Sequence, residues 1–313
     1  MYIFHSNLHS KSWKTAKKMA TLSVLLTTFL FTTVYGSLPT QSVLGMIARQ
    51  YVLTDLFETA GLDATINTGG PFTLFAPSDH SISSKSIAAL KNDTQALGNF
   101  LKNHLVSGKY MMDDLRINEM MLDSLAGGKI RVNNYLFNKV ITVEGSQIVR
   151  PDQLASNGVV HLISRPIILP NGTITDIIST NANFTTLKTA VETAGLSNVL
   201  TEGPYTLMAP SNDAFNALGS GTVQKLLARP DLLKQILMYH VLHGTLYTAG
   251  MHSGSFHTLE EADRERFSQF FLASVLVDGS HILMRDISAT NGVVHMIDHV
   301  LIPSSLKIEI NAL

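Results

Sequence analysis

The sequence repeats itself over a long, nearly constant interval, and this repetition limits the folds it can adopt. Five residues, Glu-Thr-Ala-Gly-Leu, recur letter for letter, and two further blocks recur in the same order with few changes. A repeat of about 130 residues is a whole folding unit, because the units of a solenoid run from about 20 to 50 residues. The paired blocks are Glu58–Leu62 with Glu192–Leu196, Gly70–Ser78 with Gly203–Ser211, and Asn157–His161 with Asn291–His295. The chain is therefore predicted to hold two copies of one domain.

The length of the chain agrees with this interpretation, because 313 residues suit two domains of about 100–200 residues each. We expect the first domain over residues 38–170 and the second over residues 173–303, followed by a short tail over residues 304–313. The boundary falls at Pro170-Asn171-Gly172, whose residue types favour a turn.

Residues 1–36 have the order of charge and hydrophobicity that is typical of a secretory signal peptide. Lysines precede an uncharged apolar run, Leu22–Tyr35, and the small residues before Ser37 suit a signal-peptidase site. The run has about 14 residues, fewer than the roughly 20 that span a bilayer, which disfavours the alternative of a membrane anchor. Translation from Met19 would leave a signal of more typical length. We therefore expect the protein to be secreted to the extracellular space or matrix.

Composition narrows the classes of function. Removal of residues 1–36 takes away four of the 23 basic residues and none of the 24 acidic ones. The remaining chain is net negative and has no basic stripe for phosphates, which argues against a nucleic-acid partner. The lack of cysteine excludes disulfides, thiol catalysis and cysteine-based zinc or iron–sulfur sites. No later segment is long and apolar enough to predict a membrane span.

Three glycosylation sequons follow the predicted signal, at Asn92, Asn171 and Asn183. A single triplet of this kind arises often by chance. In a secreted chain, however, the three asparagines become candidate glycan sites at the surface.

The coarse pattern within each copy predicts helices followed by strands. In the first copy a helical apolar stripe ends at Gly61, a residue type that favours a left-handed cap. The stripe consists of Val43, Leu44, Ile47, Tyr51 and Leu56. A β-rich run follows over residues 72–76, then a second helix over 97–105, then strands over 139–143, 147–149 and 159–163. Helices first and antiparallel strands later favour an α+β unit.

These blocks, taken together and in order, resemble the fasciclin-like family. Each copy has T-x-x-A-P-S, then a helix that carries a histidine, then N-G-V-V-H and a terminal proline, over about Leu38 to Pro303. The resemblance implies an α+β fold, a tandem repeat of a wedge-shaped β-sandwich with surrounding helices. It also implies a secreted cell-adhesion or extracellular-matrix protein that acts through protein–protein contacts, with no catalysis and no cofactor. The residues expected to be structural are His104, His240, Pro77, Pro210, Asn157 and Asn291.

The resemblance also implies partners and the residues that contact them. The family's proposed integrin-contacting segments are a Tyr-His block and an Asp-Ile block, which Tyr239-His240 and Asp286-Ile287 match in the second copy. An integrin-like cell-surface receptor or a matrix protein is the partner implied. The first copy departs at both places, with Asn103-His104 and Asp152-Gln153. The alternative that Tyr239 packs inside and Asp286 caps a turn stays open.

The second copy departs from the first at one further stretch. Where the first copy has Ala126–Lys129 at the start of a hairpin, the second has Glu260–Arg266, whose acidic and basic residues lie at helical spacings. We expect a short helical or solvated insertion there.

The histidines do not form a pattern that predicts a metal site. His104 and His240 lie among leucines at helical spacing, which favours core histidines with partnered ring nitrogens. His295 and His299 lie in an alternating, β-like run, where four residues span roughly 13 Å and cannot share a metal ion.

An enzyme is not predicted either. Ser78 and Ser211 follow a proline and lack the G-x-S-x-G pattern of a nucleophile, so they favour helix N-caps. The alternative function is a secreted carbohydrate- or lipid-binding protein of the same fold, which an aromatic-lined pocket would indicate. Aromatic residues make up only 7% of the chain, and the single tryptophan, Trp13, lies in the predicted signal.

Overall fold

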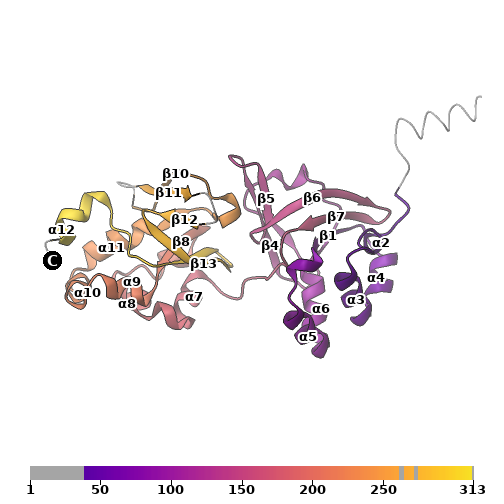
Figure 1. The fold of residues 1–313 in the computed structure, drawn as a ribbon, viewed down its shortest axis with the longest axis horizontal. Coiled ribbons are helices and arrows are strands. Elements are labelled where there is room, and N and C mark those ends of the chain that lie inside the picture. The colour runs from indigo at the N-terminus through magenta and orange to yellow at the C-terminus, as the bar shows by residue number, and fades with distance from the viewer. Residues whose placement is uncertain (1–38, 261–263, 271–273, 312–313) are drawn as a thin grey trace, which may run out of the picture.

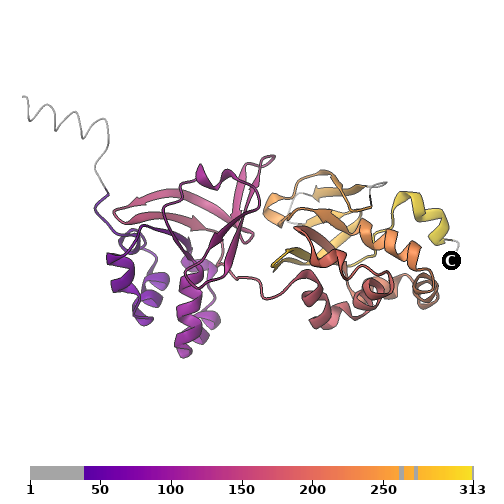
Figure 2. The same cartoon turned by 180° about the vertical axis from the view of Figure 1, so that it is seen from behind.

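The structure is a computed structural model that describes residues 39–260, 264–270 and 274–311. Two lobes lie end to end along the long axis, and in each lobe helices cover one side of a β-sheet (Figure 1 and Figure 2). The predicted signal peptide, residues 1–36, falls outside the described residues. Within those residues, no helix is both long enough and apolar enough to cross a membrane.

The first lobe begins with short helices. They are α2 (Val43–Met46), α3 (Tyr51–Thr59), α4 (Asp63–Thr68), η1 (Asp79–Ser81), α5 (Ser84–Asn92), α6 (Thr94–Asn103) and η2 (Asp114–Arg116). The predicted apolar stripe is not one helix, because the chain turns between α2 and α3. This break shifts the phase of the helical pattern, so Tyr51 is 77% exposed while Leu56 is buried. Gly61 follows α3 in the left-handed conformation, with a φ of 64°.

The strands of the first lobe form one sheet in the order β2-β1-β7-β6-β5-β4-β3. They are β1 (Phe72–Pro77), β2 (Leu105–Ser107), β3 (Met120–Asp123), β4 (Lys129–Tyr135), β5 (Val140–Val143), β6 (Ser146–Ala155) and β7 (Gly158–Ile163). Two register shifts interrupt the pairing of β6 with β7, and shifts of this kind bend a strand. A bridge between Val106 and Ser124 joins the two ends of the sheet. The sheet therefore folds over into a sandwich, which agrees with the fold that the resemblance implies.

Two hydrophobic cores fill the first lobe, and alternate residues of β1 contribute to each. Leu74 packs with Phe57 and Leu101 between the helices and the sheet. Its neighbour Phe75 points to the opposite face and packs with Val132 inside the folded sheet. Because β1 is buried on both faces, its sequence is apolar except for Thr73, whose hydroxyl donates to Gly108 O at 2.8 Å.

The second lobe repeats this arrangement, with the strand order β10-β11-β12-β13-β14-β8-β9. Its helices are α7 (Ile174–Thr180), η3 (Ala182–Phe184), α8 (Thr185–Thr193), η4 (Val199–Thr201), α9 (Asn212–Ala217), α10 (Ser220–Leu227), α11 (Pro230–Tyr239), η5 (Thr248–Gly250), η6 (Ser304–Leu306) and α12 (Lys307–Asn311). Its strands are β8 (Tyr205–Pro210), β9 (Val241–His243), β10 (Gly254–His257), β11 (Arg264–Phe270), β12 (Ser274–Val277), β13 (Ser280–Ala289) and β14 (Gly292–Ile297). The predicted duplication of one α+β unit is confirmed.

The predicted helical insertion in the second copy is wrong at residues 264–266. These residues belong to β11, which pairs with β10 on one side and with β12 on the other. Residues 261–263 lie outside the described residues. Charge pairs at helical spacing contribute only about 0.2–0.5 kcal/mol each, and the backbone hydrogen bonds to two neighbouring strands outweigh them.

The two serines predicted to cap helices differ. Ser211 begins α9, and its Oγ accepts a hydrogen bond from the Ala214 N–H at 3.1 Å. Ser78 precedes only the short η1, and its side chain makes no capping hydrogen bond. The N-cap prediction is therefore confirmed in the second lobe and wrong in the first.

Candidate functional site

The two histidines predicted to be structural lie at equivalent helix ends, one in each lobe. His104 and His240 cap the C-termini of α6 and α11, and the chain then continues into β2 and β9. Each ring is fully buried, with Nδ1–H donating to a carbonyl of the preceding turn and Nε2 accepting a backbone N–H from beyond the last strand. The partners are Phe100 O (2.8 Å) and Ile167 N (2.9 Å) for His104, and Ile236 O (2.7 Å) and Leu301 N (2.9 Å) for His240. Burial lowers the pKa of both rings to about 4.

The asparagine of each N-G-V-V-H block ties the last hairpin to the helical layer. Asn157 donates through Nδ2 to two backbone carbonyls and accepts a backbone N–H through Oδ1, and Asn291 does the same. The partners are Ile66 O, Gly69 O and Val43 N for Asn157, and Leu200 O, Glu202 O and Ile174 N for Asn291. Pro77 and Pro210 are the buried last residues of β1 and β8.

The histidine of the same block has a role that the sequence analysis did not assign. His295 is fully buried; its Nδ1 accepts the Asp286 N–H at 3.1 Å, and its Nε2–H donates to Leu246 O at 2.9 Å. His161 makes the equivalent bonds in the first lobe, to Asp152 and Tyr110. The ring therefore holds the bend of the long strand against the segment that follows β2 or β9.

The four residues predicted to contact a partner lie largely inside the protein. Tyr239 is 4% exposed and donates its hydroxyl to Asp278, and His240 is fully buried. The Asp286 side chain is 3% exposed, and Ile287 packs against the helix-side core of the second lobe. The structure agrees with the alternative that Tyr239 packs inside, and other residues of this chain occupy the polar atoms of both Tyr239 and Asp286. Contact of the four residues with a partner stays a prediction.

Asp286 is buried because the first lobe covers it. Its Oδ2 lies 3.0 Å from Nη1 of Arg165, which follows the last strand of the first lobe. The backbone N–H and the hydroxyl of Thr248 also donate to its carboxylate, at 2.8 and 2.7 Å. The predicted site residue therefore belongs to a polar junction between the two lobes, which is the candidate functional site.

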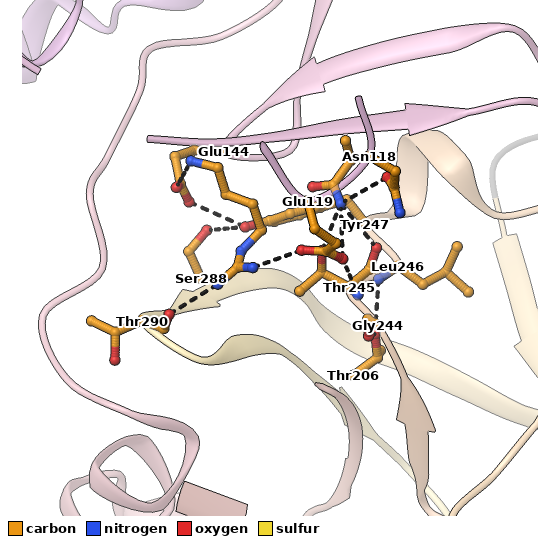
Figure 3. Close-up of polar contacts among 12 residues, drawn as sticks. Asn118, Glu119, Glu144, Thr206, Gly244, Thr245, Leu246, Tyr247, Ser288 and Thr290 are labelled. Carbon is orange, nitrogen blue, oxygen red and sulfur yellow. Dashed lines mark hydrogen bonds and ion pairs between the residues drawn. The ribbon is translucent and has the colours of Figure 1, made fainter. Parts of the chain in front are cut away.

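Glu119 is the main hydrogen-bond acceptor of this junction (Figure 3). Its Oε1 accepts from both the backbone N–H and the hydroxyl of Thr245 in the second lobe, at 2.7 and 2.6 Å. Its Oε2 accepts from Arg131 at 2.6 Å, and the other end of that guanidinium donates to Thr290 O at 2.9 Å. Asn133 adds a bond from Nδ2 to the Thr245 hydroxyl at 2.7 Å. The junction thus binds two different segments of the second lobe.

Two tyrosines cross the junction in opposite directions, and each packs on a glycine of the other lobe. A Cβ on Gly250 would lie 2.4 Å from the ring of Tyr135, and a Cβ on Gly145 would lie 2.2 Å from the ring of Tyr247. The Tyr135 hydroxyl donates to Thr245 O at 3.0 Å and accepts from the Tyr247 N–H at 2.9 Å. No larger residue than glycine fits either position while the lobes are docked this way.

Glu144 lies under the second of these tyrosines. It is 6% exposed; its Oε1 accepts the Arg131 N–H at 2.7 Å, and its Oε2 accepts the Tyr247 hydroxyl at 3.1 Å. The same hydroxyl lies 2.8 Å from the Ser288 Oγ (Figure 3). Burial raises the pKa of the Glu144 carboxyl above its ordinary value.

The rim of the junction is aromatic. At the tip of the β4–β5 hairpin, Phe137 stacks on His252 of the second lobe with 3.8 Å between ring centroids, and Asn138 donates to Ala249 O at 2.9 Å. Phe137 nevertheless keeps 71% of its surface exposed, and Leu136 beside it is also exposed. These contacts extend the junction from its buried polar centre to the surface.

The chemistry of the junction suits assembly of the two lobes. Two of its carboxylates pair with guanidinium groups, those of Glu119 with Arg131 and of Asp286 with Arg165. In the described part of the chain no group of three or more His, Asp or Glu residues is arranged to hold a metal ion. The sequence analysis missed the junction, although the two copies carry a signal for it. The segment of copy one that is equivalent to Thr245–Thr248 is Lys109–Met112, so Met111 stands where copy two has Tyr247. A polar segment present in only one of two repeats is typical of a surface that only that repeat uses.

Comparison with known proteins agrees with the duplicated fold. The profile of the family described as Fasciclin domain matches residues 50–170 and 182–303. The chain is 32% identical over 278 residues to transforming growth factor-beta-induced protein ig-h3 of Sus scrofa, an alignment that covers 82% of this chain and 40% of that protein. It is 28% identical to human periostin over 266 residues, covering 83% of this chain and 31% of periostin. The chain therefore spans well under half the length of these relatives.

A solved structure of a two-domain segment of the insect cell adhesion molecule fasciclin I is also similar. It shares 17% sequence identity with this chain, has a TM-score of 0.41, and the match covers 83% of this chain and 95% of the solved one.

Proposed function

Because this chain belongs to the fasciclin family, we propose that it is a secreted cell-adhesion or extracellular-matrix protein that acts through protein–protein contacts and does not catalyse a reaction. The observation that carries the proposal is the family match in both domains, together with similarity to ig-h3 and periostin over more than four fifths of the chain. The expected partners are an integrin-like receptor at the cell surface or proteins of the matrix.

The geometry refines which residues such a partner can reach. Tyr239 and His240 lie inside the second lobe, so we propose that they act on a contact by supporting the surface above them. Asp286 becomes accessible only when the lobes separate, since Arg165 covers it in the docked arrangement. We therefore expect a partner of the docked protein to bind groups on the outer surface of the two-lobed unit.

The three sequons favour passage through the secretory route. Asn92, Asn171 and Asn183 are all exposed, at the end of α5, between the lobes and in η3. Each asparagine can therefore carry a glycan without disturbing a core.

A cell-attachment assay on the purified full chain tests the proposal. We expect cells to attach and spread on surfaces coated with the folded chain, and attachment to fall when divalent cations are chelated, because integrin-type receptors bind through a metal ion. Heat-denatured chain and albumin at equal coating density are the controls. Attachment no stronger than on albumin, with folding verified, would contradict an adhesive function.

A further inference from the structure

The junction between the lobes contains an imbalance of charge. Three carboxylates meet there, those of Glu119, Glu144 and Asp286, but only two guanidinium groups. Arg131 pairs with Glu119 at 2.6 Å and Arg165 pairs with Asp286 at 3.0 Å. In the described ranges, no side-chain nitrogen of Lys, Arg or His lies within 4.0 Å of the Glu144 carboxylate. Glu144 therefore has no cationic group in contact, although the charge of Arg131 acts on it from a longer distance and partly offsets the effect of burial on its pKa.

Docking itself is what buries this carboxyl group. Glu144 and Gly145 form the two-residue turn between β5 and β6, a position that normally faces water. The Tyr247 ring from the second lobe lies against Gly145, and the Tyr247 hydroxyl bonds the Glu144 carboxyl. When the lobes separate, the Tyr247 side chain no longer covers the Glu144 carboxyl, and water can hydrate it. A buried carboxylate that lacks a cation is costly, whereas its protonated form is not.

We propose that Glu144 makes docking of the two lobes proton-dependent: the carboxyl is protonated in the docked pair, and its ionisation as the pH rises loosens the junction. In the protonated form the Glu144 O–H donates to the Tyr247 Oη, which in turn donates to the Ser288 Oγ. On ionisation the first of these bonds reverses, so that the Tyr247 hydroxyl donates to the carboxylate, and a third negative charge is added to the junction.

The direction of the pH dependence follows from linkage. Burial in the docked pair raises the pKa of Glu144 above its ordinary value, to which the carboxyl would return when separation of the lobes hydrates it. Its contribution to docking is fully present below the ordinary carboxyl pKa and is lost as the pH rises through the docked pKa. Between these two values the docking equilibrium constant falls by up to tenfold per pH unit, since one proton is released on opening.

The other charged or titratable groups of the junction surround Glu144 from both lobes. They are Arg131 and Tyr135 of β4, Glu119 before β3, Arg165 after β7, Tyr247 before η5, Asp286 of β13 and His295 of β14. The two guanidinium groups are committed to their own carboxylates, and His295 is held neutral because burial lowers its pKa. In this set, Glu144 is therefore the group that docking keeps from ionising.

Distance measurements between one label in each lobe test the proposal on the full chain. The protein has no cysteine, so Ala89→Cys in α5 and Gln235→Cys in α11, both exposed, can be labelled selectively. We expect one narrow distance distribution at pH 5 and a growing second, broader population as the pH rises to 9. In Glu144→Gln, which imitates the protonated carboxyl, the distribution should stay narrow throughout, and its melting temperature should exceed that of the parent more at pH 9 than at pH 5.

The matched control is Asp278→Asn, which removes a carboxylate from the equivalent turn of the second lobe, where it bonds Tyr239 of the same lobe. It should leave the pH dependence of the distance distribution as in the parent. If Glu144→Gln and the parent show the same pH dependence of both distance and melting temperature, Glu144 does not control docking and the proposal is overturned.

Discussion

The imidazole rings of His104 and His240 each hold a helix end to the segment that follows the last strand. Each ring is buried and makes two hydrogen bonds to backbone atoms that are far apart in sequence. The neutral ring serves both bonds, since one nitrogen donates and the other accepts. Protonation would put a second N–H against the backbone N–H of Ile167 or Leu301, so the folded state disfavours it.

The stability of the protein should therefore fall as the medium becomes mildly acidic. Burial lowers the pKa of each ring from 6.5 to about 4, so between these values the unfolded state binds more protons. The stability from each neutral ring is present above pH 6.5 and is lost as the pH falls toward 4. From pH 6.5 to 5 we expect a loss of about 2 kcal/mol of unfolding free energy per ring. Urea unfolding at several pH values measures it.

The matched variants are His240→Gln and His257→Gln, the latter at an exposed position. His240→Gln should lower the unfolding free energy at pH 7 by about 2–4 kcal/mol and flatten the pH dependence of the second lobe. His257→Gln should leave both unchanged. An undiminished pH dependence in His240→Gln would show that another group is responsible.

At the scale of elements, much of the fold can be predicted from the sequence. The runs at β1, β5 and β7 are largely apolar over lengths typical of strands, and the structure has a strand at each of the three places. The break between α2 and α3 was not predictable from periodicity, because Tyr51 fits the helical spacing and only the three-dimensional turn exposes it. The charges of 264–266 likewise imitate a helix, and long-range pairing with β10 and β12 overrides them.

A pair of serines tests the capping argument at this scale. Ser211→Ala removes the hydrogen bond to the Ala214 N–H at the start of α9 and should destabilise the second lobe by about 1 kcal/mol. Ser78→Ala, in the equivalent position of the first lobe, removes no capping bond and should change the unfolding free energy by less than about 0.5 kcal/mol. Thermal or urea unfolding of the two variants gives the comparison. Equal losses in both would contradict the capping assignment.

At the scale of the whole molecule, the resemblance predicted two domains but not how they meet. The junction joins residues more than 100 positions apart, such as Glu119 with Thr245 and Arg131 with Thr290. No periodicity connects such residues, and the difference between Tyr247 and Met111 shows only that the repeats are used differently. The same docking explains why Asp286, which fits an exposed contact by its type, is buried.

Gly250→Ala tests whether the lobes are docked as the structure has them. The substitution adds one methyl group, which would lie 2.4 Å from the Tyr135 ring, and the backbone at this glycine is not in the left-handed region. The variant therefore leaves the second lobe able to fold, but its methyl group occupies the space that the Tyr135 ring fills in the docked arrangement. Overpacking of this kind costs about 1–3 kcal/mol. The cost weakens docking of the lobes and not the fold of either one, because the ring belongs to the other lobe. We expect a larger radius of gyration and a broader distance distribution between labels on α5 and α11.

Gly98→Ala in α6 is the control, because a Cβ there meets no atom within 4 Å. It should leave the distance distribution unchanged and, in a helix interior, stabilise the first lobe by about 0.5–1 kcal/mol. If Gly250→Ala keeps the radius of gyration and the distance distribution of the parent, the Tyr135 ring does not pack against Gly250 in solution. The reciprocal packing of the two tyrosines, and with it the burial of Glu144 by docking, would then have to be abandoned.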